Sequence, residues 1–412
     1  MGILTVVIAI LVIMLMARKR INIGLAMFAG CIILVLGIPL GKEQITQGLR
    51  VAFFSPVTWE LAAAVLLIGA LGHILKASGT LSIMVDRLLK LMGDHRWIMI
   101  VLPGLIGALS VPGGAMMSAP LVDQLGDRVK IGPEYKTGLN IIFRHIWYLS
   151  LPIIPSMILA ASLVDLRPQQ LAVLNLPALI AGLVGAWFFL LRPLRGEVQG
   201  KWNVQDFCEF ILSIVPLLLV IIFYLVFGVN FVLSLAAGIV AALIILPKPG
   251  PQPLFSRMLS TGWARAKTMI LPGLRPSLIL VVAGIMLFKE LLTISSVVNA
   301  FASDLVNLGI PLWLLLLFLP MLVGLATGSH EAAVGVALPV FVPMLPSDIY
   351  LAGVGLTYLT ATLGYLSSPL HLCIILTREF FQANFAKIYR YILPVVLVML
   401  VSGLLTALFR GL

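Results

Sequence analysis

Arg144 and His145 are the most unexpected polar residues of this chain, because they lie in the middle of an apolar stretch from Ile141 to Ser156. Placing an ionisable side chain deep in lipid costs at least about 2.5 kcal/mol, so such a residue predicts a functional site. A guanidinium binds carboxylates and other anions through paired N–H donors. Arg144 is therefore expected either to attract an anionic substrate or to form a buried ion pair, for which Glu331 is the obvious partner.

His330 and Glu331 form a second ionisable pair, again within an apolar segment. A carboxylate beside an imidazole can load and release a proton near neutral pH. We expect Glu331, assisted by His330, to bind a coupling proton or cation. The alternative is a polar tip that solvent reaches, with no part in coupling.

Small and polar residues mark four places where a membrane helix would break: residues 110–114, 150–152, 327–331 and 367–369. A helix broken inside a membrane leaves unpaired N–H groups at one new end and unpaired C=O groups at the other. These ends attract anions and cations respectively, whereas glycines in such places can also serve close helix packing alone. The predicted substrate site comprises Ser110, Val111, Pro112, Gly113, Gly114, Asn140, Arg144, His145, Ser150, Thr327, Gly328, Ser329, His330, Ser367, Ser368 and His371, and the predicted coupling-ion site comprises Glu331, His330, Ser150 and Ser367.

Other chemistry is not indicated by the sequence. No histidine pair has metal-ligand spacing, and there is no phosphate loop, dinucleotide fingerprint or nucleophile elbow. Cys31, Cys208 and Cys373 fall within apolar segments and are expected as small buried side chains. We therefore expect no catalytic residue, no metal and no cofactor other than Na⁺ or H⁺ as a coupling ion.

Composition shows which elements must position these residues. Of the 412 residues, 61% are hydrophobic and 10% are charged, whereas soluble domains have about 45–50% and 25%. The net charge of +11 does not indicate a nucleic-acid partner, because the Lys and Arg residues are scattered between apolar segments. The sequence predicts an all-α, multi-pass protein of the cytoplasmic membrane of a prokaryote, with the lipid bilayer as a partner.

The apolar segments form two related sets. They lie at about 2–17, 21–38, 55–76, 97–122, 137–163, 171–191, 208–227, 231–246, 276–291, 311–345, 350–376 and 387–409. An offset of 217 residues aligns Tyr148-Leu149-Ser150 and Pro152 with Tyr365-Leu366-Ser367 and Pro369. If residues 97–122 and 311–345 are hairpins that enter and leave on one side, each repeat crosses the membrane five times, and the second repeat is inverted.

The distribution of positive charge favours this topology. With the N-terminus outside and ten crossings, 21 of the 27 Lys and Arg residues fall in cytoplasmic loops, five fall outside and Arg144 lies in a span, as the positive-inside rule requires. Both termini are then outside. The predicted units are scaffold helices at 1–95 and 208–310, transport units at 96–191 and 311–412, and a cytoplasmic linker at 192–207.

The chain resembles the ion-transporter superfamily in having two interrupted segments, each followed by a break, here Ser150-Leu151-Pro152 and Ser367-Ser368-Pro369. This superfamily includes divalent-anion symporters, gluconate and citrate permeases and arsenite exporters. Within it the chain looks most like the branch called domain of unknown function 401. The resemblance covers most of the chain and implies an elevator-type transporter, a homodimer through its scaffold helices. The tips read Ser110-Val111-Pro112 and Thr327-Gly328-Ser329 instead of the Ser-Asn-Thr of dicarboxylate symporters, so dicarboxylate specificity does not follow.

The expected function is therefore secondary active transport of a small organic anion, coupled to H⁺ or Na⁺. One alternative is cation/proton exchange at Glu331. Another is a membrane-embedded enzyme or lipid carrier, in which Glu331, His330 and His145 would form an acid/base set. Two matched helix breaks argue against a purely structural membrane protein.

Overall fold

The structure is a computed structural model, and it describes residues 2–19, 21–92, 94–108, 114–194, 203–245, 268–274, 276–295 and 311–412. These residues are almost entirely helical. The first half contains α1 (Gly2–Arg18), α2 (Ile23–Gly37), α3 (Lys42–Phe54), α4 (Pro56–Ala77), α5 (Thr80–Leu91), α6 (His95–Ala108), α7 (Gly114–Arg128), α8 (Pro133–His145), the 3₁₀ turn η1 (Ile146–Leu149), α9 (Pro155–Leu163), α10 (Pro168–Ala186) and the π-helical turn η2 (Trp187–Leu191). The second half contains α11 (Val204–Ile221), η3 (Ile222–Val226), α12 (Phe231–Ile245), η4 (Leu271–Gly273), α15 (Pro276–Ser295), α17 (Leu312–Thr327), α18 (His330–Phe341), η5 (Val342–Met344), α19 (Tyr350–Leu366), α20 (Leu372–Phe381) and α21 (Phe385–Phe409).

Five helices are long and apolar enough to cross a membrane: α4, α10 with η2, α11 with η3, α15 and α21. Shorter apolar helices accompany them, among them α2, α12, α17 and α18 with η5. The chain is thus a multi-pass helical membrane protein, as its composition predicted.

The predicted helix breaks are present where the structure describes the chain. After α8, a 3₁₀ turn leads to Ser150 and Pro152 before α9 begins, and after α19 the segment 367–371 separates it from α20. Between α17 and α18, Gly328 adopts φ 60° and the Ser329 hydroxyl caps α18 by accepting a hydrogen bond from the Ala332 N–H. Glycine is favoured there because a Cβ is strained in the left-handed region. At the first tip, Ser110, Val111, Pro112 and Gly113 lie outside the described residues, and Gly114 begins α7.

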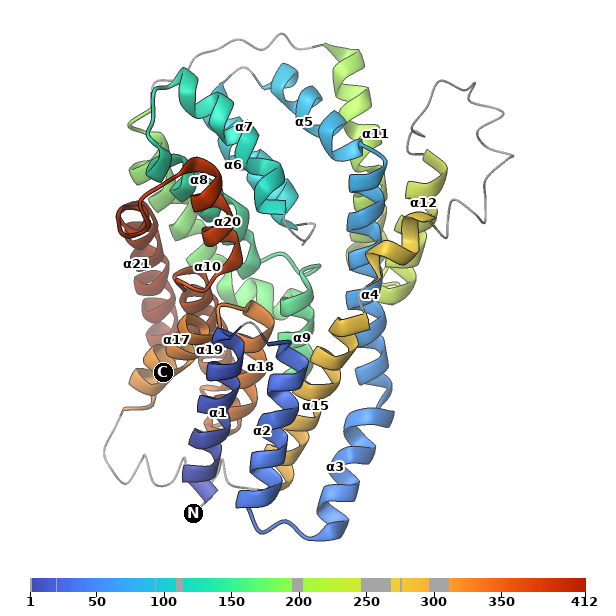
Figure 1. The fold of residues 1–412 in the computed structure, drawn as a ribbon, viewed down its shortest axis with the longest axis vertical. Helices are drawn as coiled ribbons and strands as arrows, with labels where there is room; N and C mark the ends of the chain where they lie inside the picture. Colours follow the sequence, from blue (N-terminus) through green and yellow to red (C-terminus); the bar gives the residue numbers. More distant parts are fainter. Residues whose placement is uncertain are drawn as a thin grey trace.

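Helix boundaries repeat along the chain at the offset seen in the sequence. In the first half α6, α8, α9 and α10 begin at residues 95, 133, 155 and 168. In the second half α17, α19, α20 and α21 begin at residues 312, 350, 372 and 385, in each case 217 positions later. The two hairpins lie at different heights, with α6 and α7 in the upper part of Figure 1 and α17 and α18 in the lower part. Both termini lie in the lower half of Figure 1.

Equivalent glycines pack equivalent pairs of helices in the two halves. A Cβ on Gly107 of α6 would clash with the backbone of Arg144 on α8, and a Cβ on Gly324 of α17 would clash with the backbone of Ala361 on α19. Gly324 follows Gly107 by 217 positions, and Ala361 follows Arg144 by the same number. Each first hairpin helix therefore lies directly against the helix that precedes the break.

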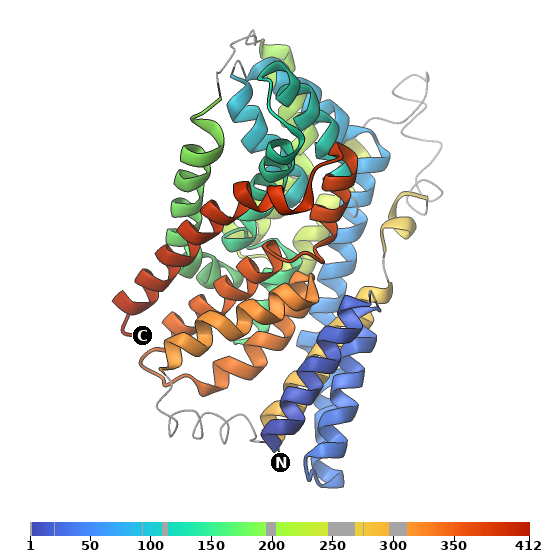
Figure 2. The ribbon, with the colours of Figure 1, turned by 60° about the vertical axis from the view of Figure 1, so that its left-hand side comes forward.

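The remaining helices surround this central group. Helix α15 packs against α2, α3 and α4, and α12 packs against both α4 and α11. Helices α1 and α2 pack together, α15 lies between α2 and α3, and Figure 2 shows α10 and α21 on the opposite side of the molecule from α1 and α2. The buried apolar side chains form one large cluster and a second, smaller one that α4, α11 and α12 share.

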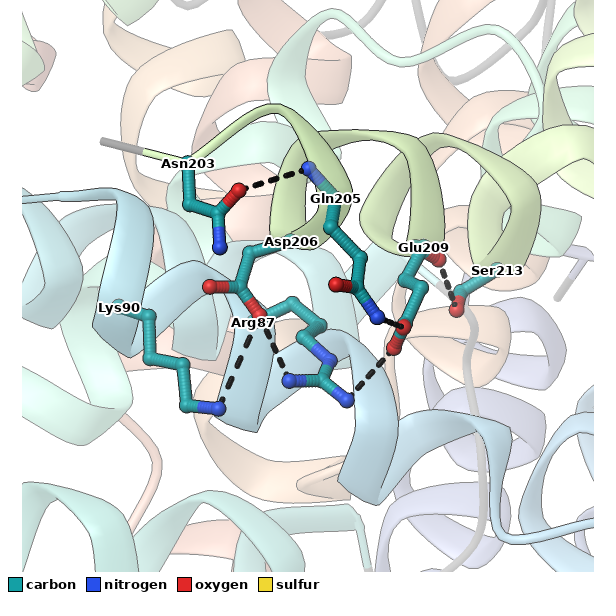
Figure 3. A network of polar contacts seen from close by, with 7 residues as sticks. All are labelled: Arg87, Lys90, Asn203, Gln205, Asp206, Glu209 and Ser213. Carbon is teal, nitrogen blue, oxygen red and sulfur yellow. Dashed lines mark hydrogen bonds and ion pairs between the residues drawn. The ribbon is translucent and has the colours of Figure 1, made fainter. Parts of the chain in front are cut away.

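The sequence also predicts interfacial amphipathic arms at 77–95, where spaced apolar residues occur with Asp86, Arg87 and Lys90, and at the equivalent segment 292–310. The first segment contains α5, and an ionic network ties α5 to α11 (Figure 3). The Arg87 guanidinium pairs with Asp206 and Glu209, both at 2.6 Å, and Lys90 lies 3.7 Å from Asp206. Since α6 follows α5 directly, the arm is fixed to the second half at the point where the first hairpin begins. The matching predicted arm at 292–310 lies largely outside the described residues.

Candidate functional site

The second hairpin tip lies against the second helix break. A Cβ on Gly328 would meet the backbone of Leu370 at 2.8 Å. The Ser368 hydroxyl donates to the Leu325 carbonyl near the end of α17, at 2.5 Å, and accepts from the Leu370 N–H at 3.1 Å. Close approach and hydrogen bonding thus join two segments that the sequence predicted separately as ligand-binding breaks.

Aromatic and imidazole rings connect this tip to the first break. The His145 ring lies 4.6 Å from His371 and 5.2 Å from Tyr148, between ring centroids. Tyr365 lies 4.2 Å from His371 and 5.2 Å from His330. The predicted site residues His145, His330 and His371 therefore belong to one buried cluster of rings.

His330 is held by two hydrogen bonds inside this cluster. Its Nε2 lies 2.8 Å from the Thr362 hydroxyl, and that hydroxyl already donates to the Tyr358 carbonyl. His330 Nε2 therefore donates to Thr362, and its Nδ1 accepts from the Ser156 hydroxyl at 2.6 Å. With both nitrogens engaged, His330 joins α18 to α9 and α19 in the described structure.

A polar seam runs between α8 and α20. Asn140 donates to the Thr377 hydroxyl at 3.2 Å, and one turn further along α8 the Arg144 guanidinium lies beside the Cys373 thiol. One turn in the other direction, Lys136 lies over the ring of Phe381. Residues four apart share a helix face, so the two antiparallel helices face each other through these three pairs.

The two ends of this seam differ in how their charges are paired. The Lys136 ammonium bonds to the carboxylates of Asp123 and Asp127 on α7, at 2.6 and 2.5 Å. Arg144 is 2% exposed, and its Nε and Nη1 have no hydrogen-bond partner. The basic group at the centre of the protein is thus the one left with free donors.

Unpaired polar atoms concentrate on α8 and on the second helix break. Among the described residues, twelve buried side-chain nitrogen and oxygen atoms lack a hydrogen-bond partner, and seven of them belong to Asn140, Arg144, His145, Ser367 and His371. Buried polar groups are normally paired, so such a concentration needs an explanation. A bound polar ligand supplies one.

Glu331 does not satisfy Arg144. In the described part of the chain no ion pair joins them, and a Glu331 carboxylate oxygen instead accepts from the Ser329 hydroxyl at 3.2 Å. Glu331 lines a cavity of about 100 Å³ whose other walls are apolar or glycine. Its lining includes Val65 of α4, Val281 of α15 and Pro155 of α9.

Of the predicted site residues, the structure brings together Asn140, Arg144, His145, Gly328, His330, Ser368 and His371. Others are placed differently. Ser150 lies at the first break, but its hydroxyl donates to the Ala172 carbonyl of α10 at 3.1 Å. Cys208 is exposed, so the prediction that all three cysteines are buried is wrong for this residue, which lies in the first turn and a half of α11.

Several residues of the cluster were not singled out from the sequence: Tyr148, Tyr358, Thr362, Tyr365, Cys373 and Thr377. A signal for some of them was available. Cys373 and Thr377 have the same four-residue spacing as Asn140 and Arg144, which suits two facing helix surfaces.

Length, composition and helix packing thus define a multi-pass α-helical membrane protein with two interrupted hairpin-and-helix units around a buried polar centre. A family model described as "Protein of unknown function (DUF401)" matches residues 1–409, so the chain belongs to this family. No curated protein matches the chain.

Proposed function

We propose that this protein is a secondary active transporter that binds a small organic anion at Arg144 and moves it across the membrane by an elevator mechanism, coupled to H⁺ or Na⁺. The observation that carries the proposal is a buried guanidinium with unpaired Nε and Nη1 donors and no ion-paired carboxylate in the described structure. A carboxylate oxygen of a ligand could accept a charge-assisted hydrogen bond from either donor, and the two donors lie on different edges of the guanidinium.

Neighbouring groups favour the same kind of ligand. The Ser367 hydroxyl is buried without a partner, and α20, a helix of ten residues, begins just after His371. The N-terminus of a helix favours a negative charge through its free N–H groups. Cys373, in the first turn of α20, lies beside Arg144, so an anion at Arg144 would meet a guanidinium and a helix N-terminus together.

Inverted repeats are supported by contacts between equivalent residues. Tyr148 and Tyr365 occupy equivalent positions in the two halves, and their rings stack with 6.2 Å between centroids. Residues that a twofold operation exchanges touch each other only close to its axis. Placing the axis between these tyrosines agrees with the repeated helix starts and with the two hairpins at different heights in Figure 1.

The proposed scaffold and transport units meet at the Glu331 cavity. Leu61 and Val65 of α4, with Val281 of α15, come from the proposed scaffold, whereas Pro155 and Glu331 come from the proposed moving units. A carboxylate at such a boundary can exchange a proton or cation as the units shift. The same observation favours a second candidate function, cation/proton exchange at Glu331 without an anionic substrate.

A ligand screen tests the proposal and separates these candidates. Purified full-length protein is heated with small carboxylates and with organic and inorganic cations at several pH values, because a ligand at 100 times its Kd stabilises the folded state by about 2.7 kcal/mol. The proposal expects stabilisation by at least one anion, and its loss in Arg144→Gln. Stabilisation by cations alone, abolished in Glu331→Gln and retained in Arg144→Gln, would overturn the anion proposal in favour of exchange.

A further inference from the structure

Three potential metal ligands converge beside the polar seam. The ligand atoms of His145, His371 and Cys373 all lie within 4.8 Å of one another. His145 is 2% exposed and His371 1% exposed, so both imidazoles are held away from bulk solvent. Two imidazoles and a thiolate form a donor set that binds soft and borderline metal ions.

The hydrogen bonds leave the required lone pairs available. His145 Nδ1 lies 2.8 Å from the Ile141 carbonyl, so this nitrogen carries the proton and Nε2 presents its lone pair. Nε2 has no hydrogen-bond partner. Such a bond from the second ring nitrogen to a carbonyl is the usual way in which a metal-binding imidazole is oriented.

His371 is equally free to bind. Neither of its nitrogens makes a well-formed hydrogen bond, although the backbone of Leu366 lies near the ring. Its position just before α20, two residues from Cys373, places both ligands on one short segment. The third ligand comes from α8, so a bound ion would join the helix before the first break to the segment after the second.

We propose that His145, His371 and Cys373 bind a soft monovalent cation of the Cu⁺ type. A monovalent ion is favoured over a divalent one, because the positively charged Arg144 guanidinium lies beside the Cys373 thiol. A thiolate with Cu⁺ is neutral overall and leaves the local charge unchanged, whereas Zn²⁺ would add a second buried positive charge beside Arg144. Binding displaces the thiol proton, which passes to solvent.

The geometry requires only a small closure. Bonds of about 2.0–2.3 Å in a three-coordinate site place the ligand atoms about 3.5–4 Å apart. The observed separations are all within 4.8 Å, so each ligand atom has to move by at most about 1.3 Å relative to the others.

Competition titration tests this site independently of transport. Full-length protein in detergent is titrated anaerobically with Cu⁺ against the chelator bicinchoninate, and one Cu⁺ per chain is expected. Cys373→Ser and His371→Gln should each weaken binding by at least about 100-fold, since even outer-sphere changes at metal sites cost 10–100-fold. Cys208→Ser and Cys31→Ser are the matched controls and should bind as the wild type does.

The outcomes separate this site from the proposed anion site. Arg144→Gln should abolish anion binding yet retain Cu⁺. X-ray absorption of the Cu⁺-loaded wild type should show one sulfur and two nitrogen ligands, which checks the site without any variant. The proposal is overturned if wild type and Cys373→Ser bind Cu⁺ equally, if the control variants lose it, or if Zn²⁺ binds more tightly than Cu⁺.

Discussion

Replacing Arg144 by Gln distinguishes an anion site from a structural ion pair. The guanidinium is 2% exposed, forms no ion pair in the described structure and has two unpaired donors. Without ligand, the wild-type protein therefore bears the cost of an uncompensated buried charge. Arg144→Gln removes that charge, so we expect the ligand-free variant to melt at or above the wild-type temperature.

Although Arg144→Gln should not lower the melting temperature of the ligand-free protein, it should weaken binding of the anion. A hydrogen bond to a charged group contributes about 1.5–3 kcal/mol, so losing the bond between the guanidinium and the anion should raise Kd on the order of 10- to 100-fold. Arg144→Lys keeps the charge but loses the planar fork, so its Kd should lie between those of the wild type and Arg144→Gln. Arg390→Gln makes the same change at an exposed position and should alter neither property.

Ligand-dependent melting curves and calorimetric titration measure both quantities on the same samples. Breaking a true buried ion pair costs about 3–5 kcal/mol of folding free energy. If ligand-free Arg144→Gln is destabilised to that extent while its Kd equals that of the wild type, Arg144 is a structural residue and the reasoning is refuted.

Three further predictions concern coupling and packing. Glu331→Gln, which cannot ionise, should make uptake into liposomes insensitive to an imposed pH gradient while anion binding persists; a variant that still responds to the gradient excludes Glu331 as the proton site. Gly107→Ala should destabilise the protein by about 1–3 kcal/mol, because its Cβ meets helix backbone, whereas Gly355→Ala, whose Cβ meets only a side chain at 3.4 Å, should be nearly neutral in the same melting assay. A double-mutant cycle with Arg87→Ala and Asp206→Ala should give a coupling energy of about 1 kcal/mol, since both groups are partly shielded from water; additive effects would show that the network does not hold α5 to α11.

Much of the fold could be predicted because helix breaks have local causes. Proline lacks an N–H, and glycine allows a positive φ, so residues 150–152, 327–331 and 367–369 marked interruptions between helices that the structure also has. The 217-residue offset found between residues of the two halves also separates the starts of their helices in the structure. These features depend on a few residues at a time and are visible in the sequence.

The partners of the central side chains could not be predicted in the same way. Which residue faces Arg144 depends on the register of α8 against α20, and that register is fixed by packing along the whole seam. Opposite charge made Glu331 the obvious partner, but Glu331 instead faces the cavity beside α4 and α15. Cys373, a residue without formal charge, lies next to Arg144.

Transport of an anion across a membrane tests the central claim most directly. The anion that stabilises the wild-type protein most is offered, radiolabelled, to proteoliposomes that contain the wild type, Arg144→Gln or Arg390→Gln, with equal amounts of folded protein in each. If Arg144 binds the transported anion, the wild type and Arg390→Gln show saturable uptake, and uptake by Arg144→Gln is no greater than that of empty liposomes. Equal uptake by Arg144→Gln and the wild type would show that Arg144 is not the anion site.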